Sequence, residues 1–320
     1  MIEPIGHELA DTDVNPEQAM HKPQVIVGTS EGLVFLDSKH YVELEGYSIN
    51  AIASSHDGLW AIANYNSVWH RDINSEWHQV ASMDDLRLKC ILPIKGAVLV
   101  GTSEAHLLRI ADGSTQRINC FDSAEGRSEW YAPLGGTLDV HSIAVGESGE
   151  FYVNVHVGGI LRSDDHGKSW QPTIKVDADV HEVRTVPTRP SLVLAATARG
   201  LAISQDKGNS WSFDRTNLHG NYSRALAVCD ETILMTAKSP SDNKSAIYRR
   251  PLDEPGTFKK CERGLPEWFL NEINTGTLAT FKNIVAFGTH DGQTFLSSDA
   301  GLTWKQIAAD LAQVFCVNLI

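Results

Sequence analysis

Short apolar runs separated by turn-forming residues recur from residue 25 to the end of the chain. Two of them, residues 25–29 and 33–35, flank a Ser-Glu-Gly turn. Pairs of the same form follow at 97–102 with 107–110 and at 232–236 with 246–249. Runs this short, bounded by Gly, Asp, Asn and Ser, predict β-strands joined by hairpins. None of them is long enough to cross a membrane as a helix.

One turn pattern, Ser-x-Asp-x-Gly-x-(Ser or Thr)-Trp, occurs three times, at residues 163–170, 204–211 and 297–304. Its Asp can accept hydrogen bonds from nearby backbone N–H groups, and its Gly allows a positive φ, so the pattern predicts a tight turn. Its Trp is expected to start the next strand and to anchor that strand in the core. We therefore expect the pattern to be structural.

The spacing of these turns divides the chain into units of about 42 residues, the length of a four-stranded propeller blade. Residues 70–77 are counted as a degenerate fourth copy, and the long gaps on either side of residues 163–211 each fit two units. With a further unit at the front, the count is seven. Six units have an apolar strand suited to the inner position, at residues 49–54, 86–93, 140–146, 180–187, 223–229 and 272–279.

The first unit has no inner strand before it, whereas the chain ends in an unpaired apolar run at residues 313–320. We expect this run to supply the inner strand of the N-terminal blade, which would close the ring and remove its exposed edges. The sequence therefore predicts an all-β fold, a seven-bladed β-propeller of four-stranded antiparallel blades over residues 24–320. Residues 1–23 are predicted to be an N-terminal tail.

The repeated turn resembles the Asp-box (BNR) repeat of β-propellers, a group that includes sialidases, some endoglucanases, sortilin-type receptors and the photosystem II assembly factor. In that group the box is a structural turn on the rim, away from the active face. The resemblance therefore implies the fold and places a site on the face opposite the boxes. It carries over no catalytic residue: sialidases of this group are six-bladed and have an Arg-Ile-Pro motif, where this chain has Arg117-Ile118-Asn119. Sialidase or glycosidase activity is not expected.

Charge and cysteine content narrow the partners and the compartment. The net charge of −13 disfavours nucleic acid and anionic membranes as partners. The five cysteines are odd in number and scattered, which favours reduced thiols. Residues 1–23 show no secretory signal pattern, so a cytoplasmic location is expected.

Polar residues gather where the inner strands are expected to begin, at one mouth of the central channel. His156 lies near the end of a second strand, in a position where other blades have Thr. Antiparallel pairing should bring it close to His141, and His181 starts the neighbouring inner strand. His290 lies one residue past the Thr position of the last blade. The first polar residues of the seven inner strands are Gln313, Asn50, Arg87, His141, His181, Arg224 and Asn271.

Three converging imidazoles, His141, His156 and His181, could hold a divalent transition metal. They could equally supply a general acid or base, with His141 and His181 as catalytic residues and Arg87 or Arg224 for an anionic group. Hydrogen bonding to a ligand and plain polar lining are further alternatives. No local metal motif such as His-Glu-x-x-His is present.

The longest connector, residues 119–139, is expected to border the same mouth, as binding loops often do. Trp130 and Tyr131 within it could stack on a ligand, together with contacts from the polar mouth residues Asn50, Asn271, His290 and Gln313. The alternative is that these aromatic residues only pin the loop to the ring. Two hypotheses follow: a small-molecule site at the mouth, with catalysis favoured, or a non-enzymatic scaffold that binds a partner protein.

Overall fold

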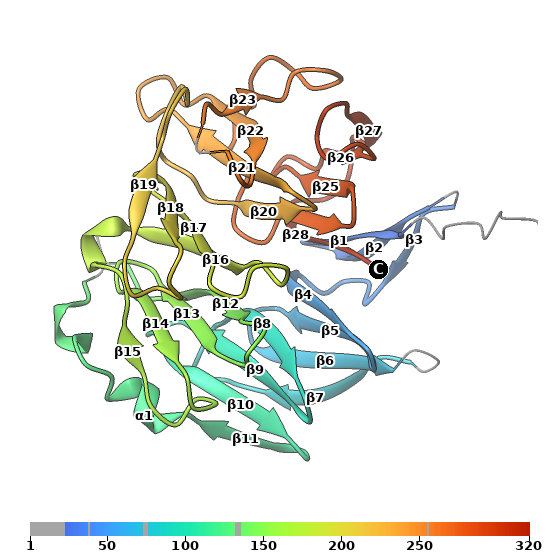
Figure 1. The fold of residues 1–320 in the computed structure, drawn as a ribbon. Helices are drawn as coiled ribbons and strands as arrows, with labels where there is room; N and C mark the ends of the chain where they lie inside the picture. The colour runs from blue at the N-terminus through green and yellow to red at the C-terminus, as the bar shows by residue number, and fades with distance from the viewer. Residues whose placement is uncertain (1–22, 38, 73–75, 132–135, 255) are drawn as a thin grey trace, which may run out of the picture.

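The computed structural model describes residues 23–37, 39–72, 76–131, 136–254 and 256–320. It contains seven four-stranded antiparallel sheets, which are the blades of a β-propeller (Figure 1). The predicted fold class is confirmed. The predicted tail lies outside the described residues, apart from residue 23.

In every blade the strands run in order from the inner to the outer position. Blade 1 has β28 (Val314–Leu319), β1 (Val25–Thr29), β2 (Gly32–Leu36) and β3 (Tyr41–Glu43). Blade 2 has β4 (Ile49–Ser55), β5 (Gly58–Ala63), β6 (Ser67–Asp72) and β7 (His78–Ser82). Blade 3 has β8 (Leu88–Ile94), β9 (Ala97–Thr102), β10 (Leu107–Ala111) and β11 (Ser114–Arg117). Blade 4 has β12 (Val140–Val145), β13 (Phe151–Val155), β14 (Gly159–Ser163) and β15 (Gln171–Pro172).

The remaining blades follow the same order. Blade 5 has β16 (Val180–Thr185), β17 (Val193–Thr197), β18 (Gly200–Ser204) and β19 (Ser212–Asp214). Blade 6 has β20 (Leu226–Cys229), β21 (Thr232–Lys238), β22 (Ser245–Pro251) and β23 (Lys259–Lys260). Blade 7 has β24 (Leu278–Phe281), β25 (Ile284–Gly288), β26 (Thr294–Ser297) and β27 (Lys305–Ala308). Short helices lie in the connectors: α1 (Asn119–Asp122), η1 (Arg127–Glu129) and η3 (Val176–Ala178). No helix of the described part of the chain is long and apolar enough to cross a membrane.

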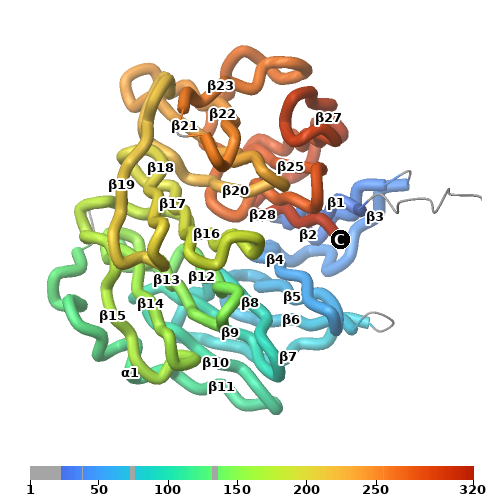
Figure 2. Tube along the Cα trace, viewed as in Figure 1, coloured from blue at the N-terminus to red at the C-terminus, as the bar shows by residue number. Residues whose placement is uncertain are grey.

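The C-terminal strand closes the ring. β28 pairs antiparallel with β1, and Gln24 and Ile320 exchange backbone hydrogen bonds of 2.8 and 3.1 Å at the end of the pair. The red strand β28 lies beside the blue strand β1 in both views (Figures 1 and 2). Each inner strand contacts the inner strand of the next blade, and β24 contacts β28, so the circuit is complete. The predicted closure is confirmed.

The three boxes have the same hydrogen-bonded geometry. In the first, the Asp165 carboxylate accepts hydrogen bonds from the backbone N–H and the hydroxyl of Ser169, at 2.9 and 2.7 Å. The Ser163 hydroxyl oxygen accepts a hydrogen bond from the Gly167 N–H at 2.8 Å, and Gly167 has a φ of 86°. The Trp170 indole N–H donates to the Gly167 carbonyl at 3.2 Å. The boxes at 204–211 and 297–304 repeat these contacts, as the sequence predicted.

The degenerate copy behaves differently. The Trp77 indole N–H donates to Glu43 of blade 1 at 2.7 Å, and residues 73–75 lie outside the described residues. All five cysteines are free, and Cys90, Cys229 and Cys316 lie on inner strands as expected.

The inner strands of blades 6 and 7 begin later than predicted, at Leu226 and Leu278. In blade 7, contacts near the central axis of the propeller explain the late start of the inner strand. The Thr275 hydroxyl lies 2.9 Å from the Arg224 carbonyl oxygen and 3.3 Å from that of His181, so the chain crosses toward two other blades before the strand starts. The preceding residues therefore form loops at the mouth.

Removing the closing strand tests the dependence of the fold on it. A chain ending at residue 312 lacks β28, so β1, β4 and β24 lose a packed neighbour. We expect the cooperative thermal unfolding transition, followed by circular dichroism, to be lost. Ile320→Ala, at a partly exposed terminal position, is the control. A truncated chain that still melts cooperatively near the full-length temperature would contradict this role.

The carboxylates of the boxes make the stability of the fold depend on pH. The hydrogen bond from the Ser169 hydroxyl lowers the pKa of Asp165 from 3.8 to about 2, together with hydrogen bonds from the Ser169 N–H and the Ser163 hydroxyl. An acid with a lowered folded-state pKa adds stability above its unfolded pKa and loses that contribution as the pH falls toward its folded pKa. We expect Asp165→Asn to melt a few degrees lower than wild type at pH 7, with a smaller gap near pH 2. Equal gaps at both pH values in calorimetry would contradict this assignment.

Candidate functional site

A row of aromatic rings lies at the mouth, where the inner strands begin. His141 and His156 stack with ring centroids 4.8 Å apart and planes 13° apart. His156 and His181 are 5.9 Å apart, and His181 and Tyr222 are 4.7 Å apart. The predicted convergence of the three imidazoles is therefore present in the structure.

β-Bulges determine which residues reach the mouth. The pairing of the first two strands skips one residue near the start of the inner strand in blades 1 to 5. A bulge leaves its extra residue unpaired and re-aims that side chain. The bulged residues are Phe315, Asn50, Lys89, His141 and His181.

The bulges correct two positions of the predicted ring. Gln313 and Arg87 precede their strands, and the bulged residues there are Phe315 and Lys89. An alternating pattern of apolar and polar residues does not show where a strand has an extra residue. Beyond that residue, every side chain lies on the opposite face from the one that the alternation predicts.

The position of His156 also needs a correction. Val155, not His156, is paired at the place that Thr197 takes in blade 5, opposite Val140 and Val180 respectively. The turn from Val155 to its partner Gly159 is one residue longer than the turn from Thr197 to Gly200. His156 lies in the turn, and its ring still stacks on that of His141. The predicted contact between the two histidines is therefore confirmed, but His156 lies one residue beyond the position that Thr occupies in blade 5.

A carboxylate joins the histidines. Asp179 Oδ1 lies 3.3 Å from His156 Nε2 and 3.5 Å from His181 Nε2. These three donor atoms all lie within 4.8 Å of one another, and His141 is not in the group. Asp179 follows η3 in the left-handed backbone region, with a φ of 49°. A non-glycine residue held there marks local strain, which is common at functional sites.

The tautomer of His181 follows from its hydrogen bond. Its Nδ1–H donates to the Ser223 carbonyl at 2.7 Å, so Nε2 carries the lone pair that faces Asp179. The side chain is fully buried. Within the described residues, His181 Nε2 and Asp179 Oδ1 are both buried and have no hydrogen-bond partner.

Burial lowers the pKa of two of the histidines. Burial lowers the pKa of His181 from 6.5 to about 4, although Asp179 acts in the opposite direction. Burial and the neighbouring His156 place the pKa of His141 well below its usual value. Burial alone would raise the pKa of Asp179, but the contact with His156 and the nearby His181 and Arg224 outweigh it and lower that pKa. Near pH 7 the site thus has neutral rings at His141 and His181 beside the Asp179 carboxylate.

The predicted arginines lie on opposite sides of this cluster. Arg224 Nε lies 2.9 Å from Glu272, which also pairs with Lys238 at 2.6 Å, so Arg224 already has a carboxylate partner. The Arg87 guanidinium lies over the Tyr65 ring at 4.2 Å, and none of the described carboxylates pairs with it. Arg87 is therefore the cation more available to an anion.

The other predicted ligand-binding residues are spread around the mouth. The Asn50 side chain accepts a hydrogen bond from the Tyr65 N–H at 2.7 Å, and so supports a turn. Gln313 and His290 are hydrogen-bonded to each other. Asn271 and His290 line a surface depression of about 430 Å³ that also includes Arg224. The structure does not bring these residues together with the histidine cluster.

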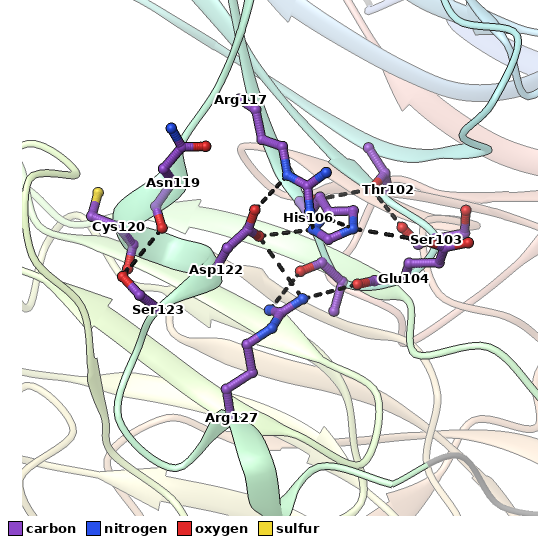
Figure 3. Close-up of polar contacts among 11 residues, drawn as sticks. Thr102, Ser103, Glu104, His106, Arg117, Asn119, Cys120, Asp122, Ser123 and Arg127 are labelled. Carbon is purple, nitrogen blue, oxygen red and sulfur yellow. Dashed lines mark hydrogen bonds and ion pairs between the residues drawn. The ribbon is translucent and has the colours of Figure 1, made fainter.

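The connector between blades 3 and 4 is held by a polar network (Figure 3). The Asp122 carboxylate contacts His106 Nδ1 at 2.8 Å and pairs with Arg117. Arg127 donates to the Ala105 carbonyl at 2.9 Å and stacks over Trp130 at 4.7 Å.

Of the two aromatic residues predicted to stack on a ligand, Trp130 is 8% exposed and packs in the core of blades 3 and 4. Tyr131 is 52% exposed. The alternative that this loop is pinned to the ring therefore fits Trp130 better than ligand stacking does.

Three residues of the mouth were missed by the sequence reasoning. Asp179 lies in a connector with no periodic pattern, and its only signal is its position two residues before His181. Tyr222 and Glu272 lie in the loops that replace the predicted starts of the inner strands in blades 6 and 7. Hydrogen bonds across the axis, not sequence pattern, fix these loops.

Comparisons with known proteins support the fold. No family model matches the chain, and no curated protein does. Among solved structures, a putative 6-phosphogluconolactonase from Bacteroides uniformis has a TM-score of 0.62 and 11% identity, covering 93% of this chain and 99% of its own. A GH74 enzyme from Niastella koreensis has a TM-score of 0.58 and 12% identity over 89% of this chain; the match spans 47% of that enzyme.

A third structure, YCF48 bound to D1 peptide, has a TM-score of 0.56 and 16% identity, with 81% of each chain covered. At such identities these likenesses concern the propeller fold alone. They do not decide between an enzyme and an interaction propeller.

Substitutions of Trp130 and Tyr131 test which of the two residues stabilises the connector between blades 3 and 4 by packing. We expect Trp130→Ala to lower the free energy of unfolding by about 3 kcal/mol, because it leaves a cavity between blades 3 and 4. Tyr131→Ala should leave stability almost unchanged. Chemical denaturation measures both, and a neutral Trp130→Ala would contradict the packing role.

Proposed function

We propose that the mouth binds a divalent transition metal through His156, Asp179 and His181, and that it uses this ion to bind, and to act on, a small anionic ligand. The observation that carries the proposal is His181 Nε2, which is buried, has no hydrogen-bond partner among the described residues and faces Asp179 Oδ1 at 3.5 Å. Buried polar atoms are rarely left unsatisfied, and a shared cation would satisfy both.

Two of the three distances between the donor atoms fit such an ion, and all three lie within 4.8 Å. Tetrahedral ligands with bonds of about 2.0–2.1 Å lie about 3.3 Å apart. The two contacts of Asp179 Oδ1 with the imidazoles, 3.3 and 3.5 Å, are close to that separation. Two histidines and one carboxylate are a recurrent set at catalytic metal sites, where a further position stays open for water or substrate.

The surroundings support the same set. The hydrogen bond from His181 Nδ1–H to Ser223 orients the ring with Nε2 toward Asp179, as is usual for metal-bound histidines. His141 stacks flat against His156 and so restrains the second imidazole. Burial lowers the pKa of His181 to about 4, so this ligand is neutral near pH 7, which is the form that binds a cation.

When bound, such an ion would act as a Lewis acid on a carbonyl or phosphoryl oxygen. Arg87 and Lys89 on the blade 3 side would attract the anionic group of the ligand. Lys89 is paired with Asp139 at 2.7 Å, so Arg87 carries the uncompensated charge. Arg224, which is held by Glu272, would act through electrostatics and not by direct contact.

Zinc titration of the metal-free protein, followed by isothermal calorimetry, tests the donor set. We expect one site per chain, with Asp179→Asn and His156→Ala each weakening zinc binding by more than about tenfold. His290→Ala, at an exposed histidine of the same face, and His141→Phe, which keeps the stacked ring, should retain zinc affinity. No zinc binding by wild type, or equal binding by Asp179→Asn, would overturn the proposal.

A second candidate function, a scaffold for a protein partner, has separate support. Leu270 is 72% exposed beside the depression that contains Asn271 and His290, and Tyr131 is exposed on the connector. YCF48, a propeller of similar fold, was solved with a bound peptide. If wild type binds no divalent ion, the scaffold becomes the better candidate.

A further inference from the structure

A cavity of about 720 Å³ lies between blades 2 and 3, on the face opposite the mouth. Trp60, His70 and Val80 of blade 2 form one wall. Two turns of blade 3, around residues 93–97 and 110–113, form the other wall. The β4–β5 turn, with Ser55 and Asp57, borders the cavity. None of these residues belongs to the proposed metal site.

In two other blade pairs, a box contacts the side-chain pair at the position that corresponds to this cavity. In blade 4, Tyr152 and Arg162 are opposite each other on β13 and β14. Both side chains donate to the Lys207 carbonyl, at 3.2 and 2.7 Å, and Lys207 lies in the box of blade 5. Likewise, Arg249 of blade 6 donates to Ala300 in the box of blade 7 at 3.1 Å. In these two blade pairs, the box of one blade covers a side-chain pair of the blade before it.

Blade 2 has the same side-chain pair without a cover. Trp60 and His70 are opposite each other on β5 and β6 and face blade 3. Blade 3 has no box: β10 and β11 are joined by a tight turn at Asp112 and Gly113, with φ values of 50° and 70°. The cavity lies between this short turn and the Trp60–His70 pair.

The uncovered pair has the form of a binding surface. The rings of His70 and Trp60 stack with centroids 4.0 Å apart. His70 is 7% exposed, and its Nε2 has no hydrogen-bond partner among the described residues. Its Nδ1 lies 3.5 Å from Asp72, and burial lowers the pKa of His70, so the ring is neutral near pH 7 with Nε2 as an acceptor.

The rim of the cavity is also rich in acceptors. The Trp60 indole N–H donates to the Ser55 hydroxyl at 3.2 Å, and Ser55 donates to the Asp57 carboxylate. The carboxylates of Asp57 and Asp112 border the cavity, and Lys95 is the only lysine or arginine among the described residues that line it. A flat aromatic floor with carboxylate and imidazole acceptors favours a planar ligand that donates hydrogen bonds.

We propose that this cavity, lined by Trp60, His70 and Asp57, is a second binding site, specific for a small aromatic molecule that carries an amino group. The ring of the ligand packs beside Trp60 in the volume that a box occupies between other blades. The amino group donates to the acceptors of His70 and Asp57. The site is independent of the mouth and of any metal there.

Saturation-transfer NMR on the full chain tests the site with tryptamine and indole-3-acetate at about 1 mM, the weak-binding limit. The two probes share the indole ring and differ in the charge of the side chain. We expect saturation transfer to tryptamine and at least about tenfold weaker binding of indole-3-acetate. No transfer to tryptamine, or equal binding of both probes, would overturn the proposal.

Variants place the binding in the cavity. His70→Phe keeps the stacked ring but removes the acceptor, and Trp60→Leu removes the aromatic floor; we expect each to weaken tryptamine binding about tenfold. Replacing residues 111–114 with the box sequence of residues 204–211 should close the cavity and abolish binding. Tyr152→Phe, at the covered pair of blade 4, and His156→Ala, at the mouth, should bind tryptamine like wild type. Undiminished binding by both His70→Phe and Trp60→Leu would overturn the assignment.

Discussion

The pairing of β28 with β1 is the contact on which the rest of the molecule depends. It joins the last residues of the chain to the first strand of the ring, so that all seven inner strands have neighbours on both sides. Closure is what brings the starts of strands that are far apart in sequence to one mouth. The histidines of blades 4 and 5 and the loops of blades 6 and 7 meet at this mouth.

Within the closed ring, short polar contacts between inner strands fix the geometry of the mouth. Thr275 of blade 7 donates to carbonyls of blades 5 and 6, and the buried Glu182 carboxylate accepts the Leu226 N–H at 2.8 Å. Burial raises the pKa of Glu182, although Arg184 beside it acts in the opposite direction. These contacts hold Asp179 and His181 in place from behind, which is the kind of support that a rigid binding site requires.

Most of the fold could be predicted from the sequence because the residues of each repeated turn determine the geometry of that turn. The Ser, Asp, Gly and Trp of a box satisfy one another locally, so the pattern predicts the same turn in each of the three blades that have it. The mouth was less readable, because bulges shift the register by one residue and no periodic signal marks a bulge. His141 and His181 were found, but Gln313 and Arg87 were predicted where the structure has Phe315 and Lys89. Asp179 was missed because a connector residue acquires its role only through contacts made in three dimensions.

Absence of a pattern also proved informative. Blade 3 lacks a box, and only the structure shows that this absence leaves Trp60 and His70 uncovered. The two proposed sites thus differ in kind: the mouth is built from residues added at bulges and turns, whereas the cavity lies beside a blade that has no box.

The most direct measurement of the central claim is X-ray absorption spectroscopy of the zinc-loaded protein, which reports the ligand atoms of the ion. The proposed donor set predicts a first shell with two imidazole nitrogens and carboxylate or water oxygens at about 2.0–2.1 Å, and no sulfur. A shell containing cysteine sulfur, or three imidazoles, would contradict the assignment of the ion to His156, Asp179 and His181.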